Sequence, residues 1–313
     1  MGDCLEKVDI LLSVYKPNEK YLIEQLVSLN NQDYPNIEVI INDDCPDSPC
    51  DRGIFETYLT KVPYRILEQD KKNLNYTKSF EKLVKASTGD YIAFCDQDDV
   101  WFSNKISKSV KTLEKENALL VASDRQIIDG DGNVIVDKYR DEHHGQTESW
   151  HTGDDITVNN LIVTHAVGMV LVVRGEFARS TVPFSVYTGH DKWIISCASK
   201  EGRVAFIDEP LVQYRRHGHN VSGVLIGIES KKDYEEKRVL INYNLIQDFL
   251  NKYPDFKDKD KLLGFATARK DHKIKDLYKY RSIAPNIAKF DIMLVFVPDF
   301  LFKTMILFAR KLR

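Results

Sequence analysis

The chain has 313 residues, of which 43% are hydrophobic and 29% are charged, and its formal net charge is −3. A chain of this length can bury one full hydrophobic core and still carry a smaller appended region. The nearly balanced charge gives no reason to expect nucleic acid as a partner, so we expect none.

The cysteines and the chain start bear on the cellular compartment. The five cysteines are scattered, odd in number and without a CxxC pair, which favours reduced thiols in a cytosolic protein. Residues 1–7 contain no apolar signal region, and no run of about 18 apolar residues follows anywhere. We therefore expect a cytoplasmic chain without a membrane-spanning helix.

The first half of the chain alternates between β-rich runs and segments of helical period. The runs expected to form strands are Val8–Val14, Ile37–Ile41, Tyr64–Leu67, Tyr91–Cys95 and Leu119–Ala122. The helical segments carry apolar residues at Leu22, Leu26 and Leu29, at Tyr76, Phe80, Leu83 and Val84, and at Ile106, Val110 and Leu113. Asn18 is a plausible start of the first helix, and Gly89 a plausible stop of the second. This alternation predicts an α/β, Rossmann-like, mostly parallel sheet with flanking helices.

The rest of the chain changes character. Its predicted elements are a hairpin of Ile127-Ile128 and Val134–Val136, strands at Met169–Val173 and Arg203–Ile207, and a helix at Asp191–Lys200. From Glu229 onward the sequence is charged and of helical composition, and from Phe290 it is strongly apolar. We expect a helical C-terminal extension.

The segment Asp96-Gln97-Asp98-Asp99 directly follows the predicted strand Tyr91–Cys95. Ligands in sheets of this kind bind at the carboxyl ends of the strands. In an extended segment Asp96 and Asp98 point the same way, and two carboxylates suit a hard cation such as Mg²⁺. The alternative is a solvated acidic turn, which is what most clusters of aspartate are.

A second acidic pair, Asp43-Asp44, follows the predicted strand Ile37–Ile41 and belongs to the same edge. A carboxylate there could accept the N3–H of a uracil or thymine ring. The alternative is ordinary turn chemistry, because Asp-Cys-Pro-Asp is a good loop sequence.

Three motifs occur in a specific order: Leu11-Leu12-Ser13-Val14-Tyr15, then Ile41-Asn42-Asp43-Asp44, then the segment from Gly89 to Trp101 that contains the acidic residues. From about Val8 to about Gly223 the chain resembles family 2 glycosyltransferases of the GT-A fold. Asp96-Gln97-Asp98-Asp99-Val100-Trp101 and the segment 213–223 are most similar to bacterial rhamnosyltransferases of surface polysaccharides. The family often has Gly-Ser where this chain has Cys45-Pro46, which bears on the shape of the base pocket.

The resemblance implies residue roles and two domains. Residues 1–225 would be the nucleotide-sugar-binding and catalytic domain, and residues 226–313 the helical region. Ser13 and Tyr15 would lie along the nucleoside, and Asp44 would hold the base. Asp96 would face the ribose, and Asp99 the sugar or a metal-bound water. Asp98 and His217 would ligate Mg²⁺ or Mn²⁺, and Arg215 could neutralise the leaving phosphates.

An inverting transfer also needs a carboxylate that takes the proton of the acceptor hydroxyl. The resemblance places this base at Asp191, in the sequence Gly189-His190-Asp191. His190 stands where the family commonly has Glu, and it could orient Asp191 or contact the acceptor. The alternative is that Asp191 only caps the helix that follows.

The sequence therefore predicts an inverting, metal-dependent transfer of a sugar from a nucleotide-sugar to a lipid-linked saccharide. By resemblance, the donor is dTDP-L-rhamnose. A UDP-hexose donor is the alternative, and a sugar-phosphate nucleotidyltransferase or a non-catalytic binding module are less favoured readings. The motif Ser13-Val14-Tyr15-Lys16-Pro17 is not the glycine-rich loop that a nucleotidyltransferase usually has.

The C-terminal tail has Leu301, Met305, Phe308 and Leu312 at helical spacing, with basic residues nearby. This pattern is typical of a helix that lies in a membrane interface. We expect peripheral attachment to the inner face of the cell membrane. The alternative is packing on the chain's own domain or on a second subunit, so a homodimer stays open.

Overall fold

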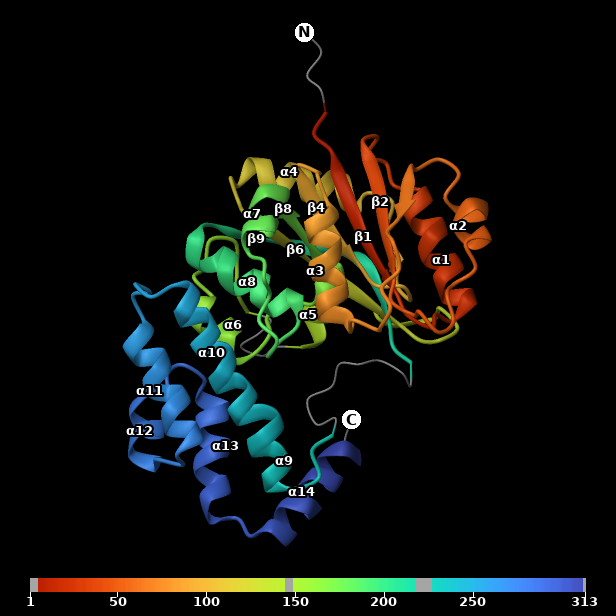
Figure 1. Ribbon diagram of the computed structural model, residues 1–313. Coiled ribbons are helices and arrows are strands. Elements are labelled where there is room, and N and C mark those ends of the chain that lie inside the picture. Colours follow the sequence, from red (N-terminus) through yellow and green to blue (C-terminus); the bar gives the residue numbers. More distant parts are fainter. Residues whose placement is uncertain (1–4, 144–148, 218–226, 312–313) are drawn as a thin grey trace. The chain divides into compact units, whose positions relative to one another are not determined.

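The computed structural model describes residues 5–143, 149–217 and 227–311, with side chains as far as residue 306. The chain divides into two compact units (Figure 1). Unit 1 comprises Met1–Thr157, Thr164–Phe184 and Gly189–Gly218, and unit 2 comprises Val158–Val163, Ser185–Thr188 and His219–Arg313. The simpler division into 1–225 and 226–313 stays a prediction.

Unit 1 contains a nine-stranded sheet in the described residues, and its first half is parallel. The strands are β1 (Val8–Val14), β2 (Ile37–Asp43), β3 (Tyr64–Ile66) and β4 (Tyr91–Cys95), in the order β3-β2-β1-β4. The connecting helices are α1 (Glu19–Asn30), α2 (Gly53–Tyr58) and α3 (Tyr76–Ala86). All five residues of β4 are buried, as expected for a strand with both faces covered.

The second half of the sheet is mixed. After β4 the order continues β8-β6-β9-β5, with β7 paired to β6 outside this path. The strands are β5 (Val100–Trp101), β6 (Leu120–Ile128), β7 (Val134–Val136), β8 (Leu171–Arg174) and β9 (Val204–Arg215). The helical elements are α4 (Lys105–Lys115), α5 (Tyr139–Glu142), η1 (Gly168–Val170), α7 (Gly175–Ser180) and α8 (His190–Glu201). Helix α6 (Thr157–Ile162) belongs, apart from Thr157, to unit 2.

The first helices form for local reasons that the sequence shows. The Asn18 side chain caps α1 by accepting a hydrogen bond from the Tyr21 backbone N–H, and the predicted leucines of α1 are fully buried. Helix α3, which lies along β1 and β2, begins after Asn75 in the same manner (Figure 1). It ends at Ala86, and Gly89 marks a close approach of backbones: a Cβ there would lie 2.7 Å from the Tyr91 carbonyl oxygen.

The strand order reverses between β1 and β4, which creates a crevice at their carboxyl ends. Strand β1 has β2 on one side and β4 on the other, and Leu12 of β1 is level with Cys95 of β4. In open α/β sheets such a switch point is where ligands bind. The segments that follow β1, β2 and β4 carry Tyr15, Asp44 and Asp96, so the fold gathers three of the predicted site residues at one edge.

Several strands differ from the sequence-based expectation. The predicted strands Leu119–Ala122 and Ile127-Ile128 are parts of one strand, β6, which begins at Leu120, and Met169-Val170 lie in η1 instead of a strand. The strand predicted at Arg203–Ile207 continues to Arg215, and Val100–Trp101 is a short strand rather than part of a loop. Val100 is opposite Gln213 and Trp101 is opposite Val212, and the extended end of β9 also pairs with β6. A polar strand of this kind is stabilised by partners that are distant in sequence, so periodicity alone does not reveal it.

Unit 2 is helical, as expected. Its elements beyond residue 226 are α9 (Lys231–Tyr234), η2 (Glu235–Leu240), α10 (Ile241–Lys252), α11 (Lys259–Lys270), α12 (Ile274–Lys279), α13 (Pro285–Phe296) and α14 (Asp299–Lys311). A buried ion pair joins Arg269 to Asp291 at 2.7 Å, and Tyr234 donates its hydroxyl hydrogen to the same carboxylate. Because both charges are paired and hydrogen-bonded, burial of the pair is tolerated.

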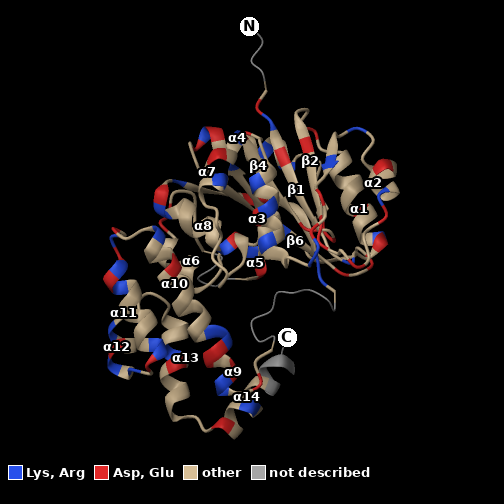
Figure 2. Cartoon of the chain, viewed as in Figure 1, with Lys and Arg blue, Asp and Glu red and all other residues tan. Residues whose placement is uncertain are grey.

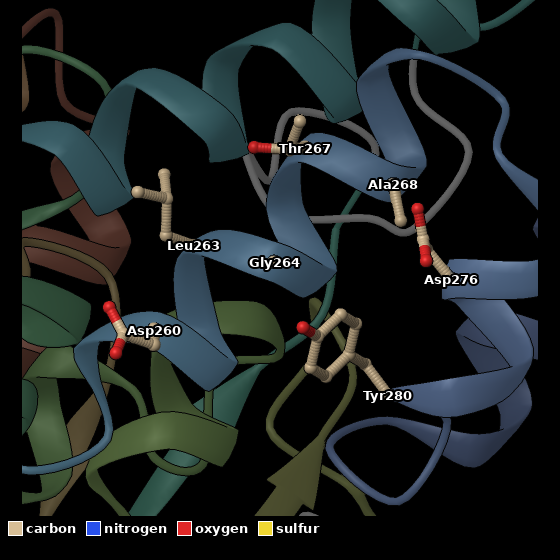
Figure 3. Close-up of a pocket in the computed structure, with 7 residues that line it drawn as sticks. All are labelled: Asp260, Leu263, Gly264, Thr267, Ala268, Asp276 and Tyr280. Atoms are coloured by element: carbon tan, nitrogen blue, oxygen red, sulfur yellow. The ribbon is translucent and has the colours of Figure 1, made fainter.

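A hollow of about 310 Å³ lies between α11 and α12, where Tyr280 packs over Gly264 (Figure 3). Basic and acidic residues are interspersed on the helices of both units (Figure 2). Within the described part of the chain, every helix is too short or too polar to cross a membrane.

Candidate active site

The loops after β1 and β4 are joined directly at the switch point. The Tyr15 backbone N–H donates to Gln97 Oε1 at 2.7 Å, and Gln97 Nε2 donates to the Tyr15 carbonyl at 3.0 Å. Ser13 lies 2.7 Å from the Ser79 hydroxyl of α3, which also accepts a hydrogen bond from Asn42. Tyr15 keeps 46% of its side chain exposed, so its ring is available to a ligand while its backbone is fixed.

Asp43 and Asp44 have different tasks. Asp43 accepts hydrogen bonds from the backbone N–H groups of Cys45 and Cys50, and so shapes the loop that follows β2. Asp44 is buried, with one oxygen accepting from the Leu74 N–H at 2.7 Å and the other from Asn73 Nδ2 at 2.9 Å. Burial is the main reason that the pKa of Asp44 is raised. Each carboxylate oxygen can accept more than one hydrogen bond, so Asp44 retains acceptor capacity.

The acidic loop concentrates negative charge in a buried place. Burial, together with the charges of Asp98 and Asp191, raises the pKa of Asp96 to about 7. Burial, and then the charges of Asp98 and Asp96, hold the pKa of Asp99 well above its usual range. Asp99 Oδ2 is buried and has no hydrogen-bond partner among the described residues. Such a cluster of carboxylates is more stable with a cation than without one.

The pairing of β5 with β9 brings the second half of the predicted site to this loop. Val100 is opposite Gln213, and two further residues of this antiparallel register bring Asp98 level with Arg215. His217 follows two residues later, and its Nε2 lies 2.8 Å from Asp98 Oδ2. The two predicted metal ligands are therefore neighbours, although 119 residues separate them in sequence.

Arg215 occupies a different place from the one expected of a phosphate ligand. Its side chain is fully buried, and its guanidinium group donates to the Asp98 and Asp129 carbonyls and pairs with Glu24. The expectation that Arg215 neutralises the leaving phosphates is corrected accordingly, because this guanidinium is enclosed by protein. The neighbouring Arg216 is exposed.

Asp191 is the second residue of α8, and Gly189 is the N-cap residue. Asp191 Oδ1 accepts a hydrogen bond from the Lys192 N–H at 2.7 Å. Burial outweighs this bond and raises the pKa of Asp191. Its charge acts on both Asp96 and Tyr76, so the carboxylate faces the acidic loop.

The His190 ring lies in the hydrophobic core and not where it would contact an acceptor. Its ring packs between Phe80 and Phe94, with centroid distances of 4.0 and 4.8 Å, and it is buried. Burial lowers the pKa of His190 to about 3, so the ring is neutral. His190 thus serves the core beneath the site.

Asp98 and His217, the predicted metal ligands, have side chains that suit a divalent cation. Asp98 and His217 offer a carboxylate and an imidazole on one side of the crevice. Within the described residues no group of three or more His, Cys, Asp or Glu side chains has the arrangement of a metal site. Mg²⁺ and Mn²⁺ commonly complete their coordination with phosphate oxygens and water. The pair therefore fits a cation that arrives with a nucleotide diphosphate.

Sequence patterns missed two residues at this site. Gln97 is a linker between the β1 and β4 loops, which no local pattern predicts. Tyr76 was assigned to an apolar helix face, yet half of its side chain is exposed. Its ring lies near Gly189, where an added Cβ would be 3.4 Å from it. An exposed aromatic ring beside Asp191 is suited to contact a sugar.

The comparisons with known sequences agree with this geometry. Residues 9–173, more than half of the chain, match the glycosyl transferase family 2. An uncharacterised glycosyltransferase of Methanocaldococcus jannaschii is 26% identical over 214 residues, which cover 66% of this chain and 70% of that protein. One of Rickettsia bellii is 27% identical over 221 residues, which cover 69% of this chain. The match spans only 30% of the Rickettsia protein.

Solved structures show the same fold. Residues 1–349 of TarS from S. aureus, in complex with UDP-GlcNAc, match with a TM-score of 0.60 at 17% identity, covering 90% of this chain and 82% of that one. The mannosyltransferase PcManGT of Pyrobaculum calidifontis, in complex with GDP-Man and Mn²⁺, matches with a TM-score of 0.53 at 16% identity, covering 96% and 84%. The expected α/β fold of GT-A type is confirmed. The chain belongs to glycosyl transferase family 2 and is a nucleotide-sugar-dependent glycosyltransferase.

Proposed function

We propose that the protein transfers a sugar, with inversion, from a pyrimidine nucleoside diphosphate donor to a saccharide acceptor. The observation that carries this proposal is the gathering of Asp44, Asp98, Asp191 and His217 around one switch point of the sheet. Asp44 follows β2, Asp98 follows β4, and Asp191 and His217 arrive from α8 and β9. Each of these groups has a different chemical task in such a transfer.

In this mechanism Asp191 takes the proton of the acceptor hydroxyl while that oxygen forms a bond to the anomeric carbon. The bond between this carbon and the donor phosphate oxygen breaks, and the nucleoside diphosphate leaves. Ser13 and Tyr15 lie along the nucleoside, Asp44 accepts from the base, and Asp96 and Asp99 lie toward the ribose and the sugar. Asp98 and His217 hold Mg²⁺ or Mn²⁺, which when bound supplies positive charge to the leaving phosphates.

The donor that we propose is dTDP-L-rhamnose, with a UDP-hexose as the alternative. Support comes from the motif Asp96–Trp101 and the segment 213–223, which resemble bacterial rhamnosyltransferases. Of that second segment, residues 218–223 lie outside the described part of the chain. Uracil and thymine share the N3–H that Asp44 would accept, so the two nucleotides are alike at this contact.

We further propose that the acceptor is a lipid-linked saccharide and that unit 2 touches the inner face of the cell membrane. The corner between α13 and α14 supports this contact. It exposes apolar side chains, with Phe296 at 72% and Phe300 at 68%, followed by Leu301, Val295 and Met293. Residues 285–313 contain five basic and two acidic residues, a balance that favours an anionic surface.

Nucleotide binding tests the donor class. Isothermal titration with UDP, dTDP, GDP and ADP in the presence of Mn²⁺ should give binding by the two pyrimidine nucleotides. Asp44→Asn should weaken their binding by about 10–100-fold, the usual worth of a hydrogen bond to a charged group. Asp47→Asn, an exposed change in the same loop, is the matched control. Equal binding of GDP and UDP by the unchanged protein would refute a pyrimidine donor.

A further inference from the structure

Arg215 is the largest fully buried side chain among the described residues, and it lies at the end of β9. Nε donates to the Asp98 carbonyl at 2.9 Å, and Nη1 donates to the Asp129 carbonyl at 3.2 Å. Nη2 forms an ion pair with the Glu24 carboxylate of α1. The Arg215 backbone N–H donates to Asp99 Oδ1 at 2.9 Å. One residue therefore ties together β9, the acidic loop, the β6–β7 turn and α1.

These contacts decide where His217 lies. His217 is two residues beyond Arg215, and its Nε2 is 2.8 Å from Asp98 Oδ2. The ring of Tyr21 packs against both residues, 4.5 Å from the Arg215 guanidinium and 5.5 Å from the His217 ring. The chain from Arg215 to His217 is thus held at one end by the guanidinium and along its side by α1.

The negative charge of Glu24 stabilises the buried guanidinium of Arg215. A guanidinium without exposure is costly unless a carboxylate pairs with it. Glu24 supplies that carboxylate from a half-exposed position, with 34% of its side chain accessible. It lines a groove of about 480 Å³ between α1 and the β5–β9 pair, to which Arg215 also contributes. Glu24 can therefore be changed without opening a cavity in the core.

We propose that Arg215 and Glu24 are positioning residues that hold Asp98 and His217 at the separation a divalent cation requires. This inference rests on the proposed metal role of Asp98 and His217. Neither Arg215 nor Glu24 touches the cation in this arrangement. They act by fixing the loop and the strand end that carry its two protein ligands, as groups behind a metal site commonly do.

Glu24→Gln tests the pair, and Glu19→Gln is the matched control. Both residues lie in α1 and both changes remove one negative charge, but Glu19 is exposed in the first turn. The probe is Mn²⁺ with UDP, followed by the electron paramagnetic resonance signal of free Mn²⁺. Glu24→Gln should weaken Mn²⁺ binding by about 10–100-fold, the typical effect of such a change, and Glu19→Gln should leave it unaltered.

Activity separates positioning from a general loss of folded protein. The Mn²⁺ concentration for half-maximal activity should rise in Glu24→Gln, while kcat at saturating Mn²⁺ stays close to that of the unchanged protein. Arg215→Lys keeps the positive charge but loses the forked set of N–H donors, so it should also raise the Mn²⁺ concentration for half-maximal activity. Unchanged Mn²⁺ binding in Glu24→Gln would overturn this inference alone. Absence of Mn²⁺ binding in the unchanged protein would overturn the metal role itself and this inference with it.

Discussion

Asp191 stands where a carboxylate can serve both a helix and a reaction. Its Oδ1 accepts the Lys192 N–H, while Gly189 occupies the N-cap position. The amide of asparagine would keep this hydrogen bond but could not take a proton. Substitution of this one residue therefore separates the two roles that the sequence left open.

Asp191→Asn should keep nucleotide binding and lower turnover by about 10²–10⁴, the usual contribution of a positioned base. Binding is measured by titration with UDP and dTDP, and turnover by release of the nucleotide. Glu201→Gln, at the exposed far end of the same helix, controls for the change of charge. A variant that turns over at nearly the normal rate would remove Asp191 from the mechanism.

The pH dependence of the reaction follows from the same residue. Burial raises the pKa of Asp191, so this carboxyl binds its proton at a higher pH than an exposed aspartate does. Only the ionised form is a base, so kcat/KM should fall as the pH is lowered. The midpoint should lie above about 3.9, the ordinary value for aspartate. A profile that stays flat down to that value would contradict the assignment.

At the scale of single residues, the sequence suggests which positions to consider but not how each side chain is packed. The order of the motifs pointed to Asp98 and His217, and in the structure Asp98 Oδ2 lies 2.8 Å from His217 Nε2. The motif order could not distinguish Arg215 from an exposed arginine, because burial of Arg215 depends on Glu24, 191 residues away in sequence. Tyr76 fits an apolar helix face in pattern, and only the packing of α8 reveals its exposed ring near Gly189.

At the scale of elements, strands with strong apolar patterns could be predicted and polar pairings could not. β1 and β4 have the predicted boundaries: β4 is apolar throughout, and β1 is mostly apolar, with Asp9 and Ser13 inside it. The second half of β9 combines the buried apolar residues Leu211 and Val212 with polar residues such as Gln213. Its course depends on β5 and β6, so it became apparent only in three dimensions.

The C-terminal helices show the same limit. Helical spacing predicted an outward face of Leu301, Met305, Phe308 and Leu312. Leu301 is exposed and Met305 is half-buried, whereas the side chains of Phe308 and Leu312 lie outside the described residues. The core of this region is formed instead by Ile228, Leu294, Phe302 and Ile306. The most exposed apolar residues, Phe296 and Phe300, flank Pro298 at the corner.

The double change Phe296→Ser and Phe300→Ser should weaken binding to vesicles that contain phosphatidylglycerol. These side chains are exposed, so their loss costs membrane contact rather than core packing. Sedimentation with vesicles measures the bound fraction, and Tyr278→Ser, at another exposed position of unit 2, is the control. Equal sedimentation of both variants would refute the contact. Truncation after Lys289 is a poorer test, because it removes three residues of the core.

At the scale of the whole chain, the parallel half of the sheet provides the nucleotide edge and the mixed half provides the remaining site residues. Asp44 and the acidic loop come from the parallel half, whereas His217 comes at the end of β9 and Asp191 from α8. The family match ends at residue 173, before Asp191 and His217. Of the later residues, His217 is brought to the acidic loop by the pairing of β9 with β5.

The most direct measurement is release of nucleotide from a panel of dTDP- and UDP-sugars with a lipid-linked saccharide acceptor, with and without Mg²⁺ or Mn²⁺. We expect a nucleoside diphosphate as product, loss of turnover with chelator, and a decrease of about 10²–10³ in Asp98→Asn, which removes charge from the cation site. Turnover that persists with chelator would contradict a metal-dependent sugar transfer at Asp98 and His217. Consumption of the nucleotide-sugar only when pyrophosphate is added, with a nucleoside triphosphate and a sugar phosphate as products, would instead indicate a nucleotidyltransferase.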